Sequence, residues 1–162
     1  YLQQKILENK KLPTPQKLAL ILDIDETALS NFKDYYSLDF GGTQQDILLL
    51  VAKGEKSALA PILNLYRFAK SRDVAIFFIS GRKQRHYDVT ADNLKAAGYY
   101  NWDGLYLKPN NYNNDSVIPF KTNIRKMITE QGYIIIATIG DQKVIYKENI
   151  QVKLLKFPTR FI

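Results

Sequence analysis

Residues 20–31 read LILDIDETALSN. The apolar run that begins at Leu18 leads directly into Asp23, and Asp25 follows after a single isoleucine. A continuous apolar run of this length is typical of a strand that is buried on both faces, as in a parallel sheet. We therefore expect a central strand at Leu18–Ile24 that delivers two carboxylates to one end of the sheet.

Similar apolar runs alternate with helical patterns along the rest of the chain. Further strands are expected at Val74–Ser80, Gly104–Leu107, Tyr133–Ile139 and Val152–Phe157. Helical patterns cover Leu2–Lys10, Ile47–Ala52, a stripe from Ile62 to near Arg72, residues 86–97, and a segment around Ile124–Ile128. A capping-box pattern at Thr43 and Asp46 precedes the second of these helices, and Gly132 ends the last. Strands that alternate with helices predict an α/β fold, namely a three-layer, Rossmann-like parallel sheet flanked by helices in a single domain over residues 1–162.

Composition excludes several classes of site and partner. The 162 residues fit one domain, and the absence of cysteine excludes disulfides and thiolate metal sites. No apolar run reaches the roughly 20 residues that a membrane-spanning helix needs. The net charge of +7 comes from Lys and Arg that are scattered along the chain, which favours a solvated basic surface over nucleic-acid binding. Because the chain starts at Tyr1, we expect a trimmed or processed N-terminus.

Polar residues follow three of the predicted strands. They are Asp23 and Asp25, then Ser80, Gly81 and Arg82, and then Gly140 and Asp141. Ligands of such folds bind beyond the carboxyl ends of the strands, so these residues are expected to meet at one site. Adjacent carboxylates repel each other unless a cation shares them, and Mg²⁺ with oxygen ligands fits best.

Four segments, in the expected order, resemble the motifs of the haloacid-dehalogenase-like (HAD) phosphatases. LDIDETALSN resembles the first motif, Ser80 in FFISGR the second, Lys121 in FKTNIRK the third, and Gly140-Asp141 in IGDQ the fourth. The chain is most similar to subfamily IIIB, which contains the class B and class C acid phosphatases and the plant vegetative storage proteins.

This resemblance implies a Mg²⁺-dependent acid phosphatase that hydrolyses small phosphomonoesters. Asp23 would attack phosphorus and form an aspartyl-phosphate, while Asp25 would act as a general acid and then as a base. Ser80 and Lys121 would hold the phosphoryl group. The ligands of Mg²⁺ would be Asp23, the backbone carbonyl of Asp25, and Asp141.

Further substrate-binding residues are expected beside this centre. Gly81 and Arg82 are assigned to substrate binding on the sheet side. A small, mainly helical cap is implied at about residues 31–60, after the first strand. Within it, Tyr35 and Tyr36 either stack on the substrate or pack inside the cap.

The fourth motif departs from the family pattern. In the segment GDQKVI, Ile145 stands where the family usually has a second Asp. This departure favours an alternative function, a catalytically weakened storage or binding protein on the same scaffold. The resemblance also implies a periplasmic, outer-membrane lipoprotein or secreted location, and no feature of the sequence assigns an oligomeric state.

Overall fold

The computed structural model describes residues 1–43, 46, 50, 56–140 and 153–155. Its main sheet has five strands in the order β5-β4-β1-β6-β7, and every neighbouring pair is parallel. The strands are β1 (Lys17–Leu22), β4 (Ala75–Lys83), β5 (Gly104–Lys108), β6 (Tyr133–Ile139) and β7 (Lys153–Leu155). β1 lies in the middle of the sheet. After β1 the chain adds β4 and β5 on one side and then β6 and β7 on the other, so the strand order reverses at β1.

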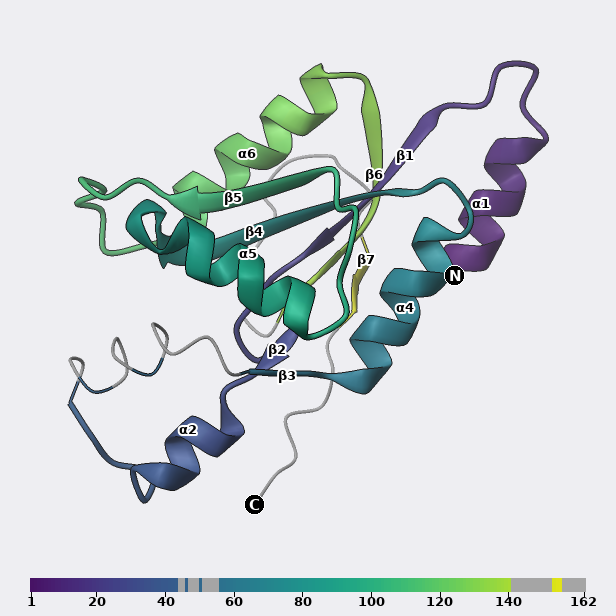
Figure 1. Cartoon of the computed structure of the whole chain (residues 1–162). Helices are drawn as coiled ribbons and strands as arrows, with labels where there is room; N and C mark the ends of the chain where they lie inside the picture. The colour runs from purple at the N-terminus through teal and green to yellow at the C-terminus, as the bar shows by residue number, and fades with distance from the viewer. Residues whose placement is uncertain (44–45, 47–49, 51–55, 141–152, 156–162) are drawn as a thin grey trace.

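Helices cover both faces of this sheet, as predicted (Figure 1). They are α1 (Leu2–Lys10), α4 (Ala60–Lys70) and α5 (Tyr87–Ala96) on one face and α6 (Ile118–Glu130) on the other, with a short 3₁₀ helix, η1 (Gln84–His86), before α5. The three-layer α/β architecture expected from the sequence is therefore confirmed. None of the helices within the described residues is long and apolar enough to span a membrane.

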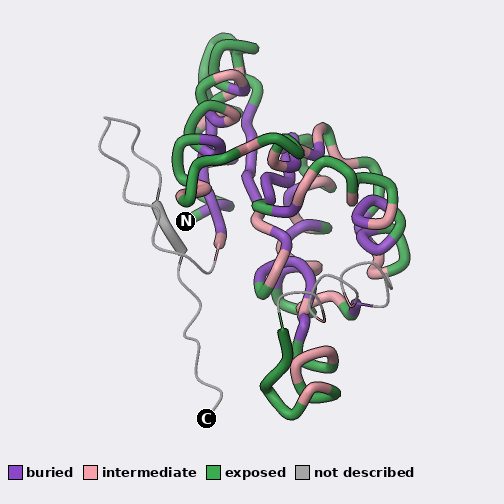
Figure 2. The backbone as a smooth tube through the Cα atoms, turned by 90° about the vertical axis from the view of Figure 1, so that its left-hand side faces the viewer, coloured by how far each residue is buried: buried purple, intermediate pink, exposed green. Residues whose placement is uncertain are grey.

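The side chains of β1 alternate between the two cores. Leu18, Leu20 and Leu22 pack with α1, α4 and α5, whereas Ala19 and Ile21 pack on the side of α6. All five are at most 7% exposed. Full burial of a Leu or Ile contributes about 1.5–3 kcal/mol, so this strand is a major source of stability. In Figure 2 the buried residues, drawn in purple, are concentrated along the sheet and the helices that face it.

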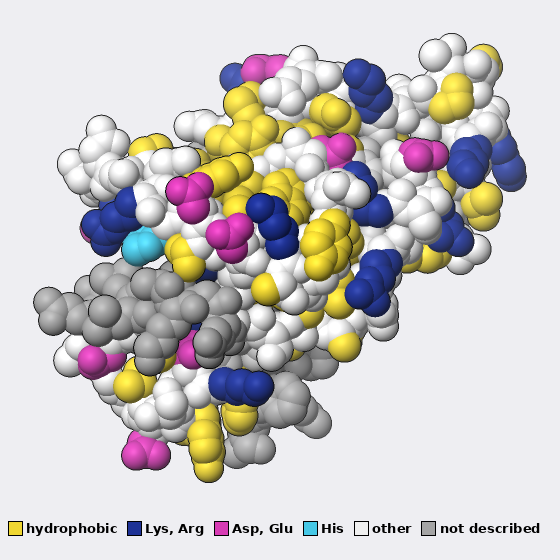
Figure 3. Space-filling view, in the orientation of Figure 1, with side chains coloured by type: hydrophobic (Ala, Val, Ile, Leu, Met, Phe, Trp, Pro, Cys, Tyr) yellow, Lys and Arg dark blue, Asp and Glu magenta, His cyan; other side chains and the backbone are white. Residues whose placement is uncertain are grey.

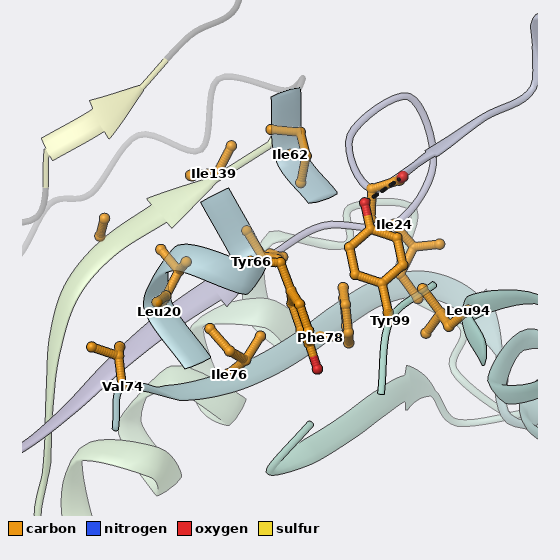
Figure 4. Close-up of a cluster of buried hydrophobic side chains, with 14 of the residues drawn as sticks. Leu20, Ile24, Ile62, Tyr66, Val74, Ile76, Phe78, Leu94, Tyr99 and Ile139 are labelled. Atoms are coloured by element: carbon orange, nitrogen blue, oxygen red, sulfur yellow. Dashed lines mark hydrogen bonds between the residues drawn. The ribbon is translucent and has the colours of Figure 1, made fainter. Parts of the chain in front are cut away.

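Aromatic rings fill the core between β4, α4 and the end of α5 (Figure 4). Tyr66 and Tyr99 meet edge to face at 5.0 Å between ring centroids, and Phe78 meets Tyr99 at 5.6 Å. The hydroxyl of Tyr99 donates a hydrogen bond to the backbone carbonyl of Ala28 at 2.9 Å. This bond attaches the segment that follows β1 to the helical layer.

Several predicted boundaries shift in the structure. β1 ends at Leu22 rather than Ile24, because the N–H groups of residues 27–29 all donate to the Ile24 carbonyl and turn the chain. β4 continues past Ser80 to Lys83, where its pairing with β5 changes register.

The ends of the helices are marked by residues of known preference. α6 begins at Ile118, well before the predicted segment, and has a proline in its first turn. Gly98 and Gly132 follow α5 and α6 with φ of 96° and 86°, a backbone region that suits glycine at a helix end. The predicted role of Gly132 at the end of α6 is thus confirmed.

The segment predicted to form a cap, at about residues 31–60, begins directly after β2 (Leu29–Ser30) and contains β3 (Ser57–Ala58), which pairs with β2 in antiparallel fashion. Its first helix is α2 (Phe32–Ser37), none of whose residues is buried. The predicted capping box is confirmed, because Asp46 Oδ2 accepts the N–H of Thr43 at 2.7 Å and Thr43 Oγ1 accepts the N–H of Asp46 at 3.3 Å. Most of the helix expected at Ile47–Ala52 lies outside the described residues, as do the outer parts of the predicted last strand.

Candidate active site

The carboxyl end of β1 is flanked by the ends of β4 and β6. The backbone N–H of Asp23 donates to the carbonyl of Ile139 at 2.9 Å, so the ladder between β1 and β6 continues up to Asp23. Gly140 then lies against Asp23, since a Cβ atom on Gly140 would stand 3.4 Å from the Asp23 Cβ. Ligand sites of such sheets lie at this point, where the strand order reverses.

Asp23 is held at both carboxylate oxygens. Its Oδ1 accepts the backbone N–H of Ile24 at 2.8 Å, and its Oδ2 forms an ion pair with the ammonium of Lys121. The two partners are 98 residues apart in the chain, and their side chains are only 13% and 9% exposed. α6 therefore brings a buried positive charge to the acid that ends β1, as expected of a site that receives an anion.

A tight loop presents Asp25 two residues later. The Ile24 carbonyl accepts the N–H groups of Ala28 and Leu29, each at 2.9 Å. Glu26 takes a φ of 51°, which non-glycine residues seldom adopt, and its Oε1 accepts the backbone N–H of Asn31 at 2.8 Å. Glu26 thus supports the loop through its hydrogen bond to the backbone of Asn31.

Both oxygens of Asp25 are hydrogen-bonded to Arg82. The guanidinium donates from Nε to Oδ2 at 3.0 Å and from Nη2 to Oδ1 at 2.7 Å, and Asn31 Nδ2 donates to Oδ1 at 3.1 Å. Burial raises the pKa of the Asp25 carboxyl, but the hydrogen bonds of Arg82 and Asn31 and the charge of Arg82 together lower it by more. The pKa of Asp25 therefore lies below its ordinary value, and the group is ionised at neutral pH.

The end of β4 contributes Ser80 and its two successors. Ser80 is 1% exposed, and its Oγ accepts the backbone N–H of Arg82 at 3.2 Å. Gly81 is exposed, with the side chain of Val117 at 3.5 Å from the place a Cβ would take. The guanidinium of Arg82 contacts Asp25. That Ser80, Gly81 and Arg82 bind substrate stays a prediction.

Oxygen donors for a divalent cation are present at this edge of the sheet. The carboxylate of Asp23 and the backbone carbonyl of Asp25 are of the hard type that Mg²⁺ prefers. Asp141, the third predicted ligand, lies outside the described residues, and within those residues no three acidic or histidine side chains cluster as a metal site. The two described oxygen donors fit such a site, and the complete set of ligands stays a prediction.

The two ends of the cap are joined by a buried ion pair. The ammonium of Lys56 contacts the carboxylate of Asp34 on α2, and the backbone N–H of Lys56 donates to Asn93 Oδ1 on α5 at 3.0 Å. The Lys56 side chain is 2% exposed, and its charge also acts to lower the pKa of Asp25. This pair places a second buried cation near the loop of the two aspartates.

The predicted tyrosines of the cap differ in their surroundings. Tyr36 is 67% exposed and stacks on Phe32 with ring centroids 6.2 Å apart, while Phe40 meets both rings edge on. Tyr35 is half-buried. The ring contacts of Tyr36 agree with packing inside the cap, and stacking of either tyrosine on a substrate is untested.

Sequence reasoning missed three polar residues that support the site, namely Asn31, Lys56 and Thr90. Asn31 belongs to the decisive segment LDIDETALSN, but only the folded loop shows that its amide contacts Asp25. Thr90 lies on the buried face of α5 and accepts a hydrogen bond from Arg82 Nη1 at 3.1 Å. A polar residue within an apolar helical stripe, as at Thr90, is a signal that would have pointed to it.

A family model described as HAD superfamily, subfamily IIIB (Acid phosphatase), matches residues 1–158. The chain belongs to this family. Acid phosphatase 1 of Solanum lycopersicum is 32% identical over 125 residues, which cover 75% of this chain and 49% of that protein. Vegetative storage protein 2 of Arabidopsis thaliana is 32% identical over 142 residues, covering 85% of this chain and 53% of that protein. The chain thus spans about half the length of these curated relatives.

The fold is shared with a solved member of the acid phosphatases. The class C acid phosphatase from Bacillus anthracis with tungstate bound aligns with a TM-score of 0.68 and 23% identity, over 85% of this chain and 55% of that chain. At this identity the likeness shows the fold alone. The predicted membership of the HAD phosphatases, with class C acid phosphatases and plant vegetative storage proteins as relatives, is confirmed.

Proposed function

We propose that this chain is a Mg²⁺-dependent acid phosphatase that hydrolyses phosphomonoesters through an aspartyl-phosphate on Asp23. The observation that carries the proposal is the contact between Lys121 and Asp23 at the end of β1. A buried ammonium beside a carboxylate provides a nucleophile together with the charge that attracts a phosphate dianion. The membership of the acid phosphatase family supports the same reaction class.

In the first step, an oxygen of Asp23 attacks phosphorus and the bond from phosphorus to the ester oxygen breaks. Asp25 is ionised at neutral pH, so it must first take up a proton; it then gives that proton to the ester oxygen, an alcohol leaves and Asp25 is again a carboxylate. Lys121 and the Ser80 hydroxyl stabilise the charge on the other phosphoryl oxygens. The products of this step are the free alcohol and phosphorylated Asp23.

In the second step, water attacks phosphorus and passes a proton to the Asp25 carboxylate. The bond between phosphorus and Asp23 breaks, inorganic phosphate leaves, and both aspartates return to their starting forms. Asp23, the Asp25 carbonyl and Asp141 would hold Mg²⁺, which when bound shields the approach of an anionic substrate to an anionic nucleophile. Location outside the cytoplasm, in the periplasm, on the outer membrane or secreted, belongs to the same proposal.

A storage or binding protein is the second candidate. It is favoured by Ile145, which replaces the second Asp of the fourth motif, and by the likeness to a vegetative storage protein. Such a protein would bind phosphate at Lys121 and Ser80 without turning over an ester. Position 145 lies outside the described residues, so the choice depends on an assay.

Hydrolysis of para-nitrophenyl phosphate with and without Mg²⁺ tests the proposal, with Asp23→Asn as the decisive variant. We expect Mg²⁺-dependent turnover that Asp23→Asn abolishes, because the amide keeps the shape of the side chain and loses its attacking charge. Asp92→Asn is the matched control, since Asp92 is exposed on α5 and its ion pair within the described part of the chain is with Lys95 on the surface. Turnover that survives in Asp23→Asn overturns the mechanism, and phosphate binding without any turnover supports the storage protein.

A further inference from the structure

We infer that Asn31 and Thr90 are positioning residues that fix the Asp25 carboxyl from two sides for proton exchange with the leaving oxygen. Neither residue is expected to touch substrate. Asn31 acts through its hydrogen bond to Asp25, and Thr90 acts through its hydrogen bond with Arg82, which in turn contacts Asp25. The inference rests on the proposed function, because it assigns both residues to the acid and base of that reaction.

Thr90 fixes Asp25 through Arg82. The hydroxyl of Thr90, which is 0% exposed, accepts Arg82 Nη1 at 3.1 Å, while Nε and Nη2 of the same guanidinium reach the two oxygens of Asp25. A guanidinium is planar and rigid, so an acceptor at Nη1 sets the direction of the other two donors. Since the Arg82 side chain is 4% exposed, no water shell competes for these positions.

Asn31 fixes Asp25 from the side of the cap. Its backbone N–H is held by Glu26 Oε1 at 2.8 Å, and its side-chain Nδ2 donates to Asp25 Oδ1 at 3.1 Å. Asn31 is 6% exposed, and its Oδ1 is buried without a hydrogen-bond partner among the described residues. The Asn31 amide is thus held by its hydrogen bond to Asp25, and an alanine at position 31 removes that bond.

These contacts leave one side of Asp25 open. Three donors from the described residues occupy the two oxygens, yet 38% of the Asp25 side chain remains exposed, while Arg82 and Asn31 beside it are buried. A leaving oxygen can therefore approach only from the exposed side. Proton transfer depends steeply on alignment, and a misplacement of about 1 Å can cost about 100-fold in rate.

The test compares substrates that do and do not need the proton. In the first step the proton moves from Asp25 to the ester oxygen as the bond to phosphorus breaks, so a simple alkyl phosphate needs it and dinitrophenyl phosphate does not. For Thr90→Val and Asn31→Ala we expect kcat/KM on the alkyl ester to fall by up to about 100-fold, with the dinitrophenyl ester nearly unaffected. Thr90→Ser keeps the hydroxyl and should restore the alkyl activity.

Matched controls separate positioning from loss of structure. Thr138→Val removes another buried hydroxyl, one that finds no hydrogen-bond partner among the described residues, and should leave both rates unchanged. Affinity for beryllium fluoride, measured by calorimetry, should also stay unchanged in Thr90→Val and Asn31→Ala, because the phosphoryl contacts are intact. If one variant fails to fold by circular dichroism, the other still decides the question.

Equal losses on both esters, or no loss on the alkyl ester, overturn the inference. These outcomes differ from failure of the proposed function, which would appear as turnover in Asp23→Asn or as no turnover in the unmodified chain. A loss confined to the alkyl ester and reversed by Thr90→Ser supports the positioning roles.

Discussion

Gly140 lies against the side chain of Asp23, so that a Cβ atom on Gly140 would stand 3.4 Å from the Asp23 Cβ and 3.6 Å from its Oδ2. One methyl group fits at that distance with little adjustment, whereas a branched side chain collides. We expect Gly140→Val to displace Asp23 and to lower turnover by up to about 100-fold. Steady-state kinetics on para-nitrophenyl phosphate measure this loss.

Gly140→Ala is the control for that variant. Its added Cβ meets Asp23 at an ordinary contact distance, so activity and melting temperature should stay near those of the unmodified chain. If Gly140→Val keeps full activity in a folded protein, the contact between these two residues does not define the position of the nucleophile.

The buried ion pair of Lys121 and Asp23 makes a prediction about stability. Lys121→Met leaves the Asp23 carboxylate without its buried cation, and breaking such a pair costs about 3 kcal/mol. We therefore expect urea unfolding to show that loss of free energy, accompanied by loss of turnover. The double variant with Asp23→Asn should recover much of the stability, because no uncompensated charge remains.

Additive losses in that cycle would contradict the prediction. They would mean that the two side chains contribute to stability independently. Lys126→Met is a suitable control, since Lys126 lies exposed on the same helix and its ion pair with Glu130 spans 3.9 Å. Exposed pairs of this kind contribute at most about 1 kcal/mol.

His86 allows a direct test of the electrostatics at the end of β4. Burial and the positive charges of Arg85 and Arg82 lower the pKa of His86 below its ordinary value of 6.5. Because the folded chain binds this proton less tightly than the unfolded chain, His86 favours folding above pH 6.5, and that contribution declines as the pH falls through 6.5 toward the folded pKa.

The single histidine of the chain gives one set of imidazole ring signals, so its titration can be followed by proton NMR without ambiguity. We expect a midpoint below 6.5 that rises in Arg85→Gln, whose side chain no longer places a charge beside His86 Nε2. A midpoint that does not move would show that Arg85 does not act on His86 in solution.

Ile145 predicts a weakened metal site. Loss of a supporting residue around a metal typically costs about 10–100-fold in affinity or activity. We expect Ile145→Asp to lower the Mg²⁺ concentration for half-maximal activity, as measured by titration of turnover. An unchanged or higher value in a folded variant would show that position 145 is not equivalent to the second Asp of the family motif.

The architecture was predictable because its strands are continuous apolar runs. β6 and α1 have the predicted bounds, and the main sheet is parallel as expected. Such runs can be recognised without knowing which strands pair with one another, because a strand that is buried on both faces consists mainly of apolar residues. The place of Asp23 at a strand end followed from the same pattern, together with the family motif.

Side-chain contacts between residues far apart in the chain were not predictable, because a polar side chain has several possible partners until the fold is known. Arg82 was assigned to substrate, and only the fold shows its guanidinium on Asp25. The pairing of β2 with β3 was not predicted, because a strand of two residues is too short to show a pattern of alternating apolar and polar residues. The pattern of α5 could mark Thr90 as a buried polar residue, but only the fold identifies its partner, Arg82 at the end of β4.

The short pairing of β2 with β3 has an evolutionary consequence. Leu29 lies opposite Ala58 and Ser30 opposite Ser57, so the insertion leaves and re-enters the body of the protein at one place. Once two ends are fixed side by side, doubling the length of the chain between them adds only about 0.6 kcal/mol of closure entropy. A longer, shorter or exchanged insertion at this place would therefore cost the body of the protein little stability, which offers evolution a route to new substrate preferences.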